Sequence, residues 1–254
     1  MMNSPFSLKG KTALITGGAT GLGLAMTHCM AAAGAKVVVV SRNGKKNFLE
    51  SCGELGSQAL YVQGDVADTS SIPALAQQIF DRAGAIDILV NNAGNHCKKP
   101  IEEMTSEDFS RVLQTHLVGS FALTRAVLPQ MRERRAGAIL FIASMTSYIG
   151  QPYVMGYSAA KSGVLGMVRT LSAETAADGI RVNAIAPGWI DTPMYRAATD
   201  NDPARRAKIL GRIQMGHVGT PEDIGWAAVY LCSDAASYIT GTCLPVDGGA
   251  LVGF

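Results

Sequence analysis

Short runs of aliphatic and β-branched residues alternate along the chain with longer segments in which apolar residues recur at helical spacing. The apolar runs predict strands at 12–16, 35–40, 59–66, 86–92, 138–144, 180–187 and 242–248. Most of them are apolar at consecutive positions, as in parallel strands that helices cover on both faces. Apolar residues at helical spacing predict helices near 22–33, 69–82, 106–133, 157–177 and 221–233. The alternation predicts an α/β fold: a single doubly wound domain over residues 1–254, with about seven parallel strands and helices on both faces.

One long segment, 189–220, shows neither the apolar run of a strand nor the spacing of a helix. Loops of this length without structure of their own are uncommon in compact domains, and those that occur often cover a functional site. We therefore expect an irregular, mobile flap over a substrate here.

Composition and charge narrow the classes of protein to consider. The 254 residues are 48% hydrophobic and 17% charged, with a formal net charge of +2. Such a charge does not favour nucleic acid or an anionic membrane as a partner, and the apolar stretches are too short to span a bilayer. The 5 cysteines lack paired spacing, which argues against a disulfide framework or a metal site and favours a reducing compartment. The polar first residues do not resemble a signal peptide, so we expect a cytoplasmic protein.

A glycine-rich turn, "TGGATGLG" at 16–23, connects the first predicted strand to the first predicted helix. At this point a tight turn lets the backbone approach a phosphate at the helix N-terminus. Glycines alone are weak evidence because any tight turn uses them. Their position directly after the first strand favours a nucleotide site.

A series of short motifs in a fixed order gives the chain a recognisable pattern. They are "TGGATGLG", "GDV" (64–66), "NNAG" (91–94), Ser144, "YSAAK" (157–161), "PG" with "DTPM" (187–194) and "VDGG" (246–249). From Gly10 to its C-terminus the chain resembles the short-chain dehydrogenase/reductase family, in its compact one-domain form with a Rossmann sheet. The resemblance implies an NAD(P)-dependent oxidoreductase.

The same resemblance implies which residues bind the cofactor, while Asn91 would brace the sheet. The cofactor-binding residues are expected to be Gly17, Thr20, Gly21, Leu22, Gly23, Ser41, Arg42, Asp65, Val66, Asn92, Ala93, Gly94, Tyr157, Lys161, Pro187, Gly188, Ile190 and Thr192.

The end of the second predicted strand bears on which cofactor binds. A site for NAD usually has a carboxylate there, which accepts hydrogen bonds from the ribose 2'-hydroxyl. This chain has Ser41 and Arg42 instead. A guanidinium beside an uncharged serine suits the 2'-phosphate of NADP. We therefore expect NADP. NAD stays the alternative because the glycine turn has no second basic residue, and because Arg42 could instead stack on the adenine or face solvent.

Tyr157 and Lys161 are four positions apart on a predicted helix and therefore share one of its faces. A phenol has a reference pKa of about 10, and a nearby ammonium lowers it, which makes a tyrosine usable as a general acid or base. In the family pattern Lys161 also contacts the nicotinamide ribose, and Ser144 donates a hydrogen bond to the substrate oxygen. The spacing of four differs from the longer gap of the enoyl reductases in this family.

The chain departs from the family at His116, where an asparagine is usual. In the family that asparagine helps to hold a water that relays protons to the lysine. An imidazole can both donate and accept a hydrogen bond, so His116 is a candidate for the same catalytic relay. The alternatives are a packed histidine outside the proton path, or a broken relay with low activity.

The loop after the fourth predicted strand carries further polar residues, where substrate loops lie in such sheets. Candidate substrate-binding residues are Ser144, His96, Lys98, Gln151, Tyr153 and Trp189. A basic residue two positions before Pro100 resembles the gluconate 5-dehydrogenase and deoxygluconate dehydrogenase branch of the family. We expect a carbonyl reductase or alcohol dehydrogenase, with a sugar or sugar acid as one substrate class. A 3-oxoacyl thioester reductase, or a cofactor-sensing protein without turnover, are the alternatives.

The helices predicted at 106–133 and 157–177 carry more apolar residues than one sheet-facing side needs. These residues are Leu113, Leu117, Phe121, Leu165, Met167 and Leu171. The family commonly pairs these helices between subunits, and the tail 248–254 adds Leu251 and Phe254. We expect a homotetramer with two-fold axes, or else a dimer whose tail folds onto its own subunit.

Overall fold

In a computed structural model of the protein, which describes residues 4–253, seven strands form one parallel sheet in the order β3-β2-β1-β4-β5-β6-β7. The strands are β1 (Thr12–Thr16), β2 (Lys36–Ser41), β3 (Ala59–Gln63), β4 (Ile88–Asn91), β5 (Gly137–Ile142), β6 (Ile180–Pro187) and β7 (Cys243–Val246). All seven predicted strands are therefore confirmed, and so is the α/β class. Phe254 lies outside the described residues.

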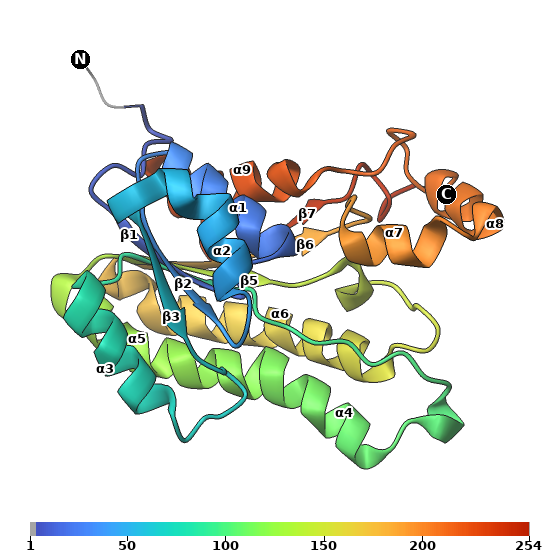
Figure 1. Ribbon diagram of the computed structural model, residues 1–254, viewed down its shortest axis with the longest axis horizontal. Helices are drawn as coiled ribbons and strands as arrows, with labels where there is room; N and C mark the ends of the chain where they lie inside the picture. Colours follow the sequence, from blue (N-terminus) through green and yellow to red (C-terminus); the bar gives the residue numbers. More distant parts are fainter. Residues whose placement is uncertain (1–3, 254) are drawn as a thin grey trace.

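Helices cover both faces of this sheet (Figure 1). One face is covered by α1 (Gly21–Ala32) and α9 (Pro221–Cys232), and the other by α3 (Ile72–Ala83), α5 (Ser120–Arg134) and α6 (Met155–Thr175). The apolar patterns did not predict α2 (Lys45–Cys52), which buries Phe48 and Cys52 beside β2. A helix of two turns that buries so few side chains leaves little periodic signal.

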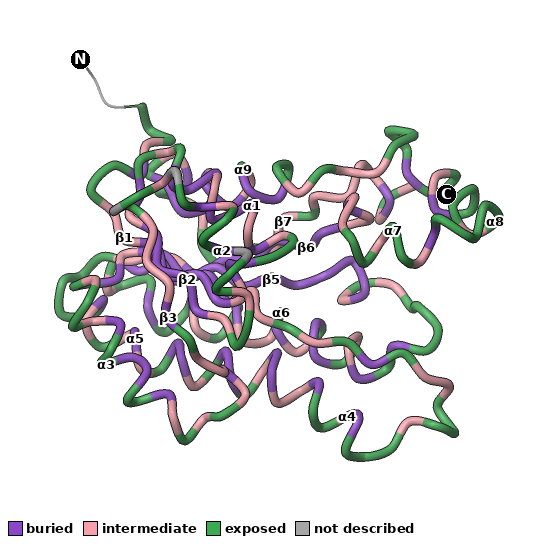
Figure 2. The backbone as a smooth tube through the Cα atoms, in the orientation of Figure 1, coloured by how far each residue is buried: buried purple, intermediate pink, exposed green. Residues whose placement is uncertain are grey.

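The core has two layers because successive strand residues point to opposite faces of the sheet. In β1, Leu14 packs into the cluster below α3, α5 and α6, whereas Ala13 and Ile15 pack into the cluster below α1 and α9. Figure 2 shows the buried residues concentrated along the strands, with exposed residues on the outer helices and loops. This double coverage explains why the strands are apolar at consecutive positions.

The helix predicted at 106–133 is interrupted in the structure. It consists of α4 (Ser106–Leu113), a π-helical turn (Gln114–Gly119) and α5. A capping box between Thr105 and Asp108 begins α4, in which each residue pairs its side chain with the other's backbone N–H. Such π-helical turns occur often at functional sites, and this one carries His116.

The segment 189–220 is not the irregular stretch that the sequence predicts. It contains α7 (Pro193–Thr199) and α8 (Pro203–Leu210), each with a proline in its first turn. The Thr192 hydroxyl accepts from the Tyr195 N–H, and the Asp202 carboxylate accepts from the Arg205 N–H. The prediction was wrong because helices of two turns are too short for periodicity to reveal, although the capping residues were visible. Within residues 4–253 no helix has both the length and the apolar character that a membrane span requires.

Candidate active site

The glycine turn lies where the sheet order changes direction, between the carboxyl ends of β1 and β4. Gly17 adopts a φ of +67°, which favours glycine. A Cβ at Gly23 would lie 2.1 Å from the Gly17 carbonyl oxygen, so only glycine fits this close approach. The Asn92 side chain donates to the Thr16 carbonyl at 2.8 Å and thereby fastens the loop after β4 to the turn. Ligands of doubly wound sheets bind at this switch point.

The first helix begins at Gly21 directly beside this turn. Its N-cap residue, Thr20, makes no side-chain hydrogen bond to the helix, so the first N–H groups have no capping partner. These donors, together with the positive end of the helix dipole, suit a phosphate group.

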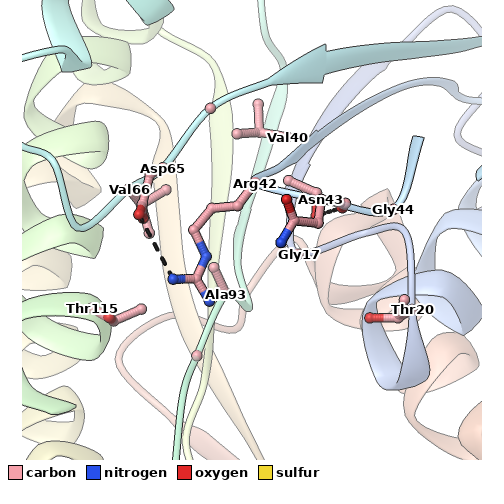
Figure 3. Close-up of a pocket in the computed structure, with 13 residues that line it drawn as sticks. Gly17, Thr20, Val40, Arg42, Asn43, Gly44, Asp65, Val66, Ala93 and Thr115 are labelled. Carbon is pink, nitrogen blue, oxygen red and sulfur yellow. Dashed lines mark hydrogen bonds and ion pairs between the residues drawn. The ribbon is translucent and has the colours of Figure 1, made fainter. Parts of the chain in front are cut away.

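A cavity of about 320 Å³ opens next to the turn (Figure 3). It is lined by Gly17, Thr20, Val40, Ser41, Arg42, Asn43, Gly44, Gly64, Asp65, Val66, Ala93, Gly94 and Thr115. Eight of these thirteen are among the expected cofactor residues, so the structure brings together residues from four separate motifs. Of the others, Gly64 belongs to the motif 64–66 and Asn43 directly follows Arg42, but no pattern pointed to Thr115.

Arg42 extends over this cavity toward Asp65 (Figure 3), and their nearest nitrogen and oxygen are 3.8 Å apart. The Arg42 side chain keeps 61% of its surface exposed, which leaves donors free for a ligand. The Ser41 hydroxyl donates to the Asn43 carbonyl, and the Ser41 carbonyl accepts from the Tyr61 hydroxyl. The turn at the end of β2 is thus braced from both sides, and its charge is positive.

Tyr157 and Lys161 lie on one face of α6, as predicted. The amine of Lys161 is 5.5 Å from the centre of the Tyr157 ring, and only 4% of Lys161 is exposed. Burial lowers the pKa of Lys161 to about 7. Burial also raises the pKa of Tyr157, while the neighbouring Ser144 hydroxyl acts in the opposite direction. In the protein alone, burial therefore opposes the lowered tyrosine pKa that catalysis needs.

Ser144 is buried two residues beyond the end of β5. Its hydroxyl accepts from the Thr146 N–H at 3.2 Å. Further along the same turn, the Ser147 hydroxyl donates to the Lys161 carbonyl at 2.8 Å. The turn that carries Ser144 is therefore bonded directly to the helix that carries Tyr157 and Lys161.

Two histidines flank the Tyr157 ring edge-on. The ring centres of His96 and His116 lie 5.1 and 5.4 Å from that of Tyr157. His116 is buried, and its Nε2 is 2.8 Å from the Asn95 carbonyl oxygen. Burial, with a smaller contribution from Lys161, lowers the pKa of His116 to about 3. Partial burial of the His96 ring, aided by Lys98, also lowers the pKa of His96. Both imidazoles are therefore neutral at physiological pH.

The remaining expected residues divide between exposed positions and structural ones. Lys98, Gln151 and Tyr153 are exposed, and the Tyr153 carbonyl accepts from the Lys99 N–H at 2.9 Å, which joins the loops 95–100 and 148–154. Trp189 is half-buried in an apolar cluster below α8.

Four expected cofactor residues follow β6 or end it. Pro187 ends the strand, and a Cβ at Gly188 would lie 2.6 Å from Asp247. Ile190 is buried in the core, and Thr192 caps α7. Asn91 donates to the Thr124 hydroxyl of α5 at 3.0 Å, so it braces a helix against the sheet. Among residues 4–253 no three His, Cys, Asp or Glu side chains are grouped so that they could hold a metal ion.

Comparison with known proteins places the chain among enzymes. A family model described as enoyl-(acyl carrier protein) reductase matches residues 17–250. The 3-oxoacyl-(acyl-carrier-protein) reductase of Salmonella typhimurium is 38% identical over 245 residues, covering 96% of this chain and 98% of the relative.

Two solved structures are similar over nearly the whole chain. A protein from Agrobacterium tumefaciens, designated a 2-deoxy-D-gluconate 3-dehydrogenase and containing bound NADP, is 42% identical with a TM-score of 0.90, covering 98% of this chain and 99% of that one. A gluconate 5-dehydrogenase from Burkholderia cenocepacia, in complex with NADP and tartrate, is 32% identical with a TM-score of 0.93, covering 98% of each chain. The motifs, the sheet order and these matches together show that the chain belongs to the short-chain dehydrogenase/reductase family of oxidoreductases.

Proposed function

We propose that the protein is an NADP(H)-dependent carbonyl reductase or alcohol dehydrogenase whose substrate is a small polyhydroxy compound, such as a sugar acid. The observation that carries the proposal is a series of contacts: the cavity beside the glycine turn is lined by Arg42 and Gly94, Gly94 lies against His116, and His116 lies against Tyr157, which shares a face of α6 with Lys161. The bound NADP of two related structures supports the choice of cofactor.

The residues present fit such a cofactor. The close approach at Gly23 and the uncapped start of α1 suit a pyrophosphate, and Arg42 beside the uncharged Ser41 suits a 2'-phosphate. When bound, NADP would supply or accept the hydride and, in its oxidised form, bring a positive ring near Tyr157. The remaining expected contacts, including Leu22, Ile190 and Thr192, belong to this proposal as well.

In this mechanism each polar side chain of the site has a defined role. Tyr157 gives its hydroxyl proton to the carbonyl oxygen during reduction, and takes it back during alcohol oxidation. Ser144 donates a hydrogen bond to the same substrate oxygen and so orients it for hydride transfer. Lys161 holds the nicotinamide ribose, and as an ammonium it favours the phenolate form of Tyr157. The Tyr157-to-Lys161 spacing of four argues against enoyl reduction.

The substrate class follows from the side chains at the mouth of the site. His96 lies against Tyr157 and, being neutral, can donate to or accept from a hydroxyl. Lys98 is exposed two residues further on and offers a cation to a carboxylate. The tartrate in the related Burkholderia cenocepacia structure is a hydroxy acid of this kind. Gln151 and Tyr153 are the further candidates at this mouth.

A second candidate function, reduction of a 3-oxoacyl thioester, is favoured by the 38% identity to the Salmonella typhimurium reductase. The two functions differ in substrate size and charge, so a panel separates them. Gluconate, 2-deoxygluconate, neutral polyols and an acetoacetyl thioester would each be tested with NADP(H) and NAD(H), following nicotinamide absorbance. Turnover of a sugar acid supports the proposal. Turnover of the thioester alone overturns it, and cofactor binding without any turnover favours a sensor.

We also propose a cytoplasmic homotetramer. Phe121 on α5 is 54% exposed, and Trp226 on α9 is 52% exposed on the opposite side of the sheet. Two exposed aromatic positions on opposite faces suit the two interfaces that a tetramer with two-fold axes requires. The tail contributes less to this argument than the sequence suggested, because Leu251 is half-buried against its own subunit.

A further inference from the structure

The imidazole of His116 contacts the backbone of Asn95. Its Nε2 lies 2.8 Å from the carbonyl oxygen of Asn95 and 3.2 Å from the N–H of the same residue. A neutral imidazole has one N–H, so only one of these contacts can be a hydrogen bond: Nε2–H donates to the carbonyl, or a bare Nε2 accepts from the Asn95 N–H. The carbonyl contact is the shorter, and two acceptor atoms 2.8 Å apart would repel each other, so the geometry favours the proton on Nε2. This hydrogen bond fixes the tautomer and ties the loop after β4 to the π-helical turn.

Gly94 provides the space that this imidazole fills. A Cβ on Gly94 would lie 2.3 Å from His116 Cε1, and the three nearest atoms to it all belong to the His116 ring. Gly94 does not have a positive φ, so its backbone would accept an alanine. The two residues are therefore matched in shape, and an alanine at Gly94 would force the His116 ring to move.

The loop that begins at Asn95 is fastened at its other end too. The Lys99 N–H donates to the Tyr153 carbonyl, and the Lys99 amine pairs with Asp108 at 2.5 Å. Asn95 also donates to the Thr115 hydroxyl at 2.9 Å. Between these two anchors the loop presents His96 to the edge of the Tyr157 ring.

We propose that His116 is a positioning residue: its Nε2–H holds Asn95, so that the loop 95–99 keeps His96 in place beside Tyr157. In this role His116 stays neutral and carries no transferred proton. At the position of the family's relay asparagine, this histidine thus positions a loop instead of relaying protons, and its ring packs against Gly94.

The first test needs no substrate. Imidazole NMR resonances of the protein labelled in its 4 histidines can be assigned by single replacements. We expect His116 to show the Nε2–H tautomer and no titration between about pH 5 and pH 8. A His116 that titrates within this range, or that carries its proton on Nδ1, would overturn the proposal.

The second test measures hydrogen exchange of peptides that cover 94–99. The amide nitrogen of glutamine can take the position of imidazole Nε2, whereas that of asparagine corresponds to Nδ1. We therefore expect exchange of this loop to rise about tenfold in His116→Ala and His116→Asn, and to stay close to that of the unaltered protein in His116→Gln. Unchanged exchange in His116→Ala, or equal loss of protection in all three variants, contradicts the role of the Nε2 hydrogen bond.

A double-mutant cycle tests the match with Gly94. Gly94→Ala should lower the melting temperature of the unaltered protein by several degrees but have little effect in the His116→Ala background. Additive effects of the two replacements would show that the residues are not coupled.

The kinetic consequence rests on the proposed function. With gluconate and NADP⁺ as the probe, His116→Ala should raise the KM for gluconate about tenfold and lower kcat much less, and His116→Gln should restore most of the KM. A relay instead predicts that both variants lose kcat. If gluconate is not turned over, the proposed substrate is wrong, while the NMR and exchange results still decide the role of His116.

Discussion

The amine of Lys161 donates a hydrogen bond to the backbone carbonyl of Ile142, at 2.5 Å, near the end of β5. This carbonyl is the only hydrogen-bond partner of that amine among the described residues, and no carboxylate pairs with it. Lys161 is thus a buried lysine without a charged partner, and its burial lowers the stability of the protein.

Replacing Lys161 by methionine should make that cost measurable. The folded pKa of Lys161 is about 7 and its ordinary value is 10.5, so between these values the unfolded chain binds more protons than the folded one. The lysine protein therefore gains stability as the pH rises, by at most about 1.4 kcal/mol per pH unit. We expect Lys161→Met to be the more stable protein at pH 6 and to lose this advantage by pH 10.

Urea denaturation of both proteins across this range, without nucleotide, provides the measurement. Effects of titrating groups that do not interact with Lys161 cancel in the difference between the two proteins. A difference in stability that does not change with pH would show that Lys161 has an ordinary pKa. In the same variant, NADPH binding and turnover should both fall, and unchanged NADPH affinity would count against the ribose contact.

Tyr157→Phe should abolish most turnover while leaving the cofactor bound. The replacement removes only the hydroxyl that transfers the proton, and such a group contributes roughly 10²–10⁴-fold to the rate. We expect kcat to fall by about this factor, with the NADPH dissociation constant within roughly threefold of the original. Near-original turnover would show that another group is the acid or base.

Ser41→Asp should shift the preference from NADP toward NAD. The new carboxylate would repel a 2'-phosphate and could accept from a ribose 2'-hydroxyl. We expect the ratio of kcat/KM for NADP to that for NAD to fall at least about tenfold. Arg42→Ala should weaken NADPH binding much more than NADH binding, because only the phosphate contact is lost.

The control for these cofactor variants is Lys46→Ala, which removes an exposed cation close in sequence to Arg42 but outside the residues that line the cavity. It should leave both nucleotide affinities as they are. If the cofactor ratio stays constant in Ser41→Asp, the phosphate binds elsewhere.

Light scattering at micromolar concentration should give the mass of four chains. Phe121→Arg places a charge on the exposed face of α5, and we expect it to reduce that mass to two chains or fewer. Lys46→Ala, at an exposed position on α2 and outside both proposed interface helices, should leave the mass unchanged. A single-chain mass for the unaltered protein excludes the tetramer, and a two-chain mass favours the dimer.

Much of the fold could be predicted because its signals are local. Each strand is a run of consecutive apolar residues, and burial on both faces of a parallel sheet imposes that pattern wherever the strand lies. The signal of the glycine turn is equally local, because the close approach of Gly23 to the Gly17 carbonyl involves residues only six positions apart. The helices α2, α7 and α8 were missed because each is too short to repeat an apolar period.

The sequence by itself determined the seven strands, the glycine turn and the shared face of Tyr157 and Lys161, because each depends on neighbours within a few residues. Only the tertiary structure decided which distant residues meet. It placed Thr115 in the cavity beside the glycine turn, packed Trp189 below α8 and set the His116 imidazole against Gly94 and the Asn95 carbonyl. These contacts join parts of the chain that different strands carry to the same edge of the sheet, and no period along the chain records which side chains fill the space between them.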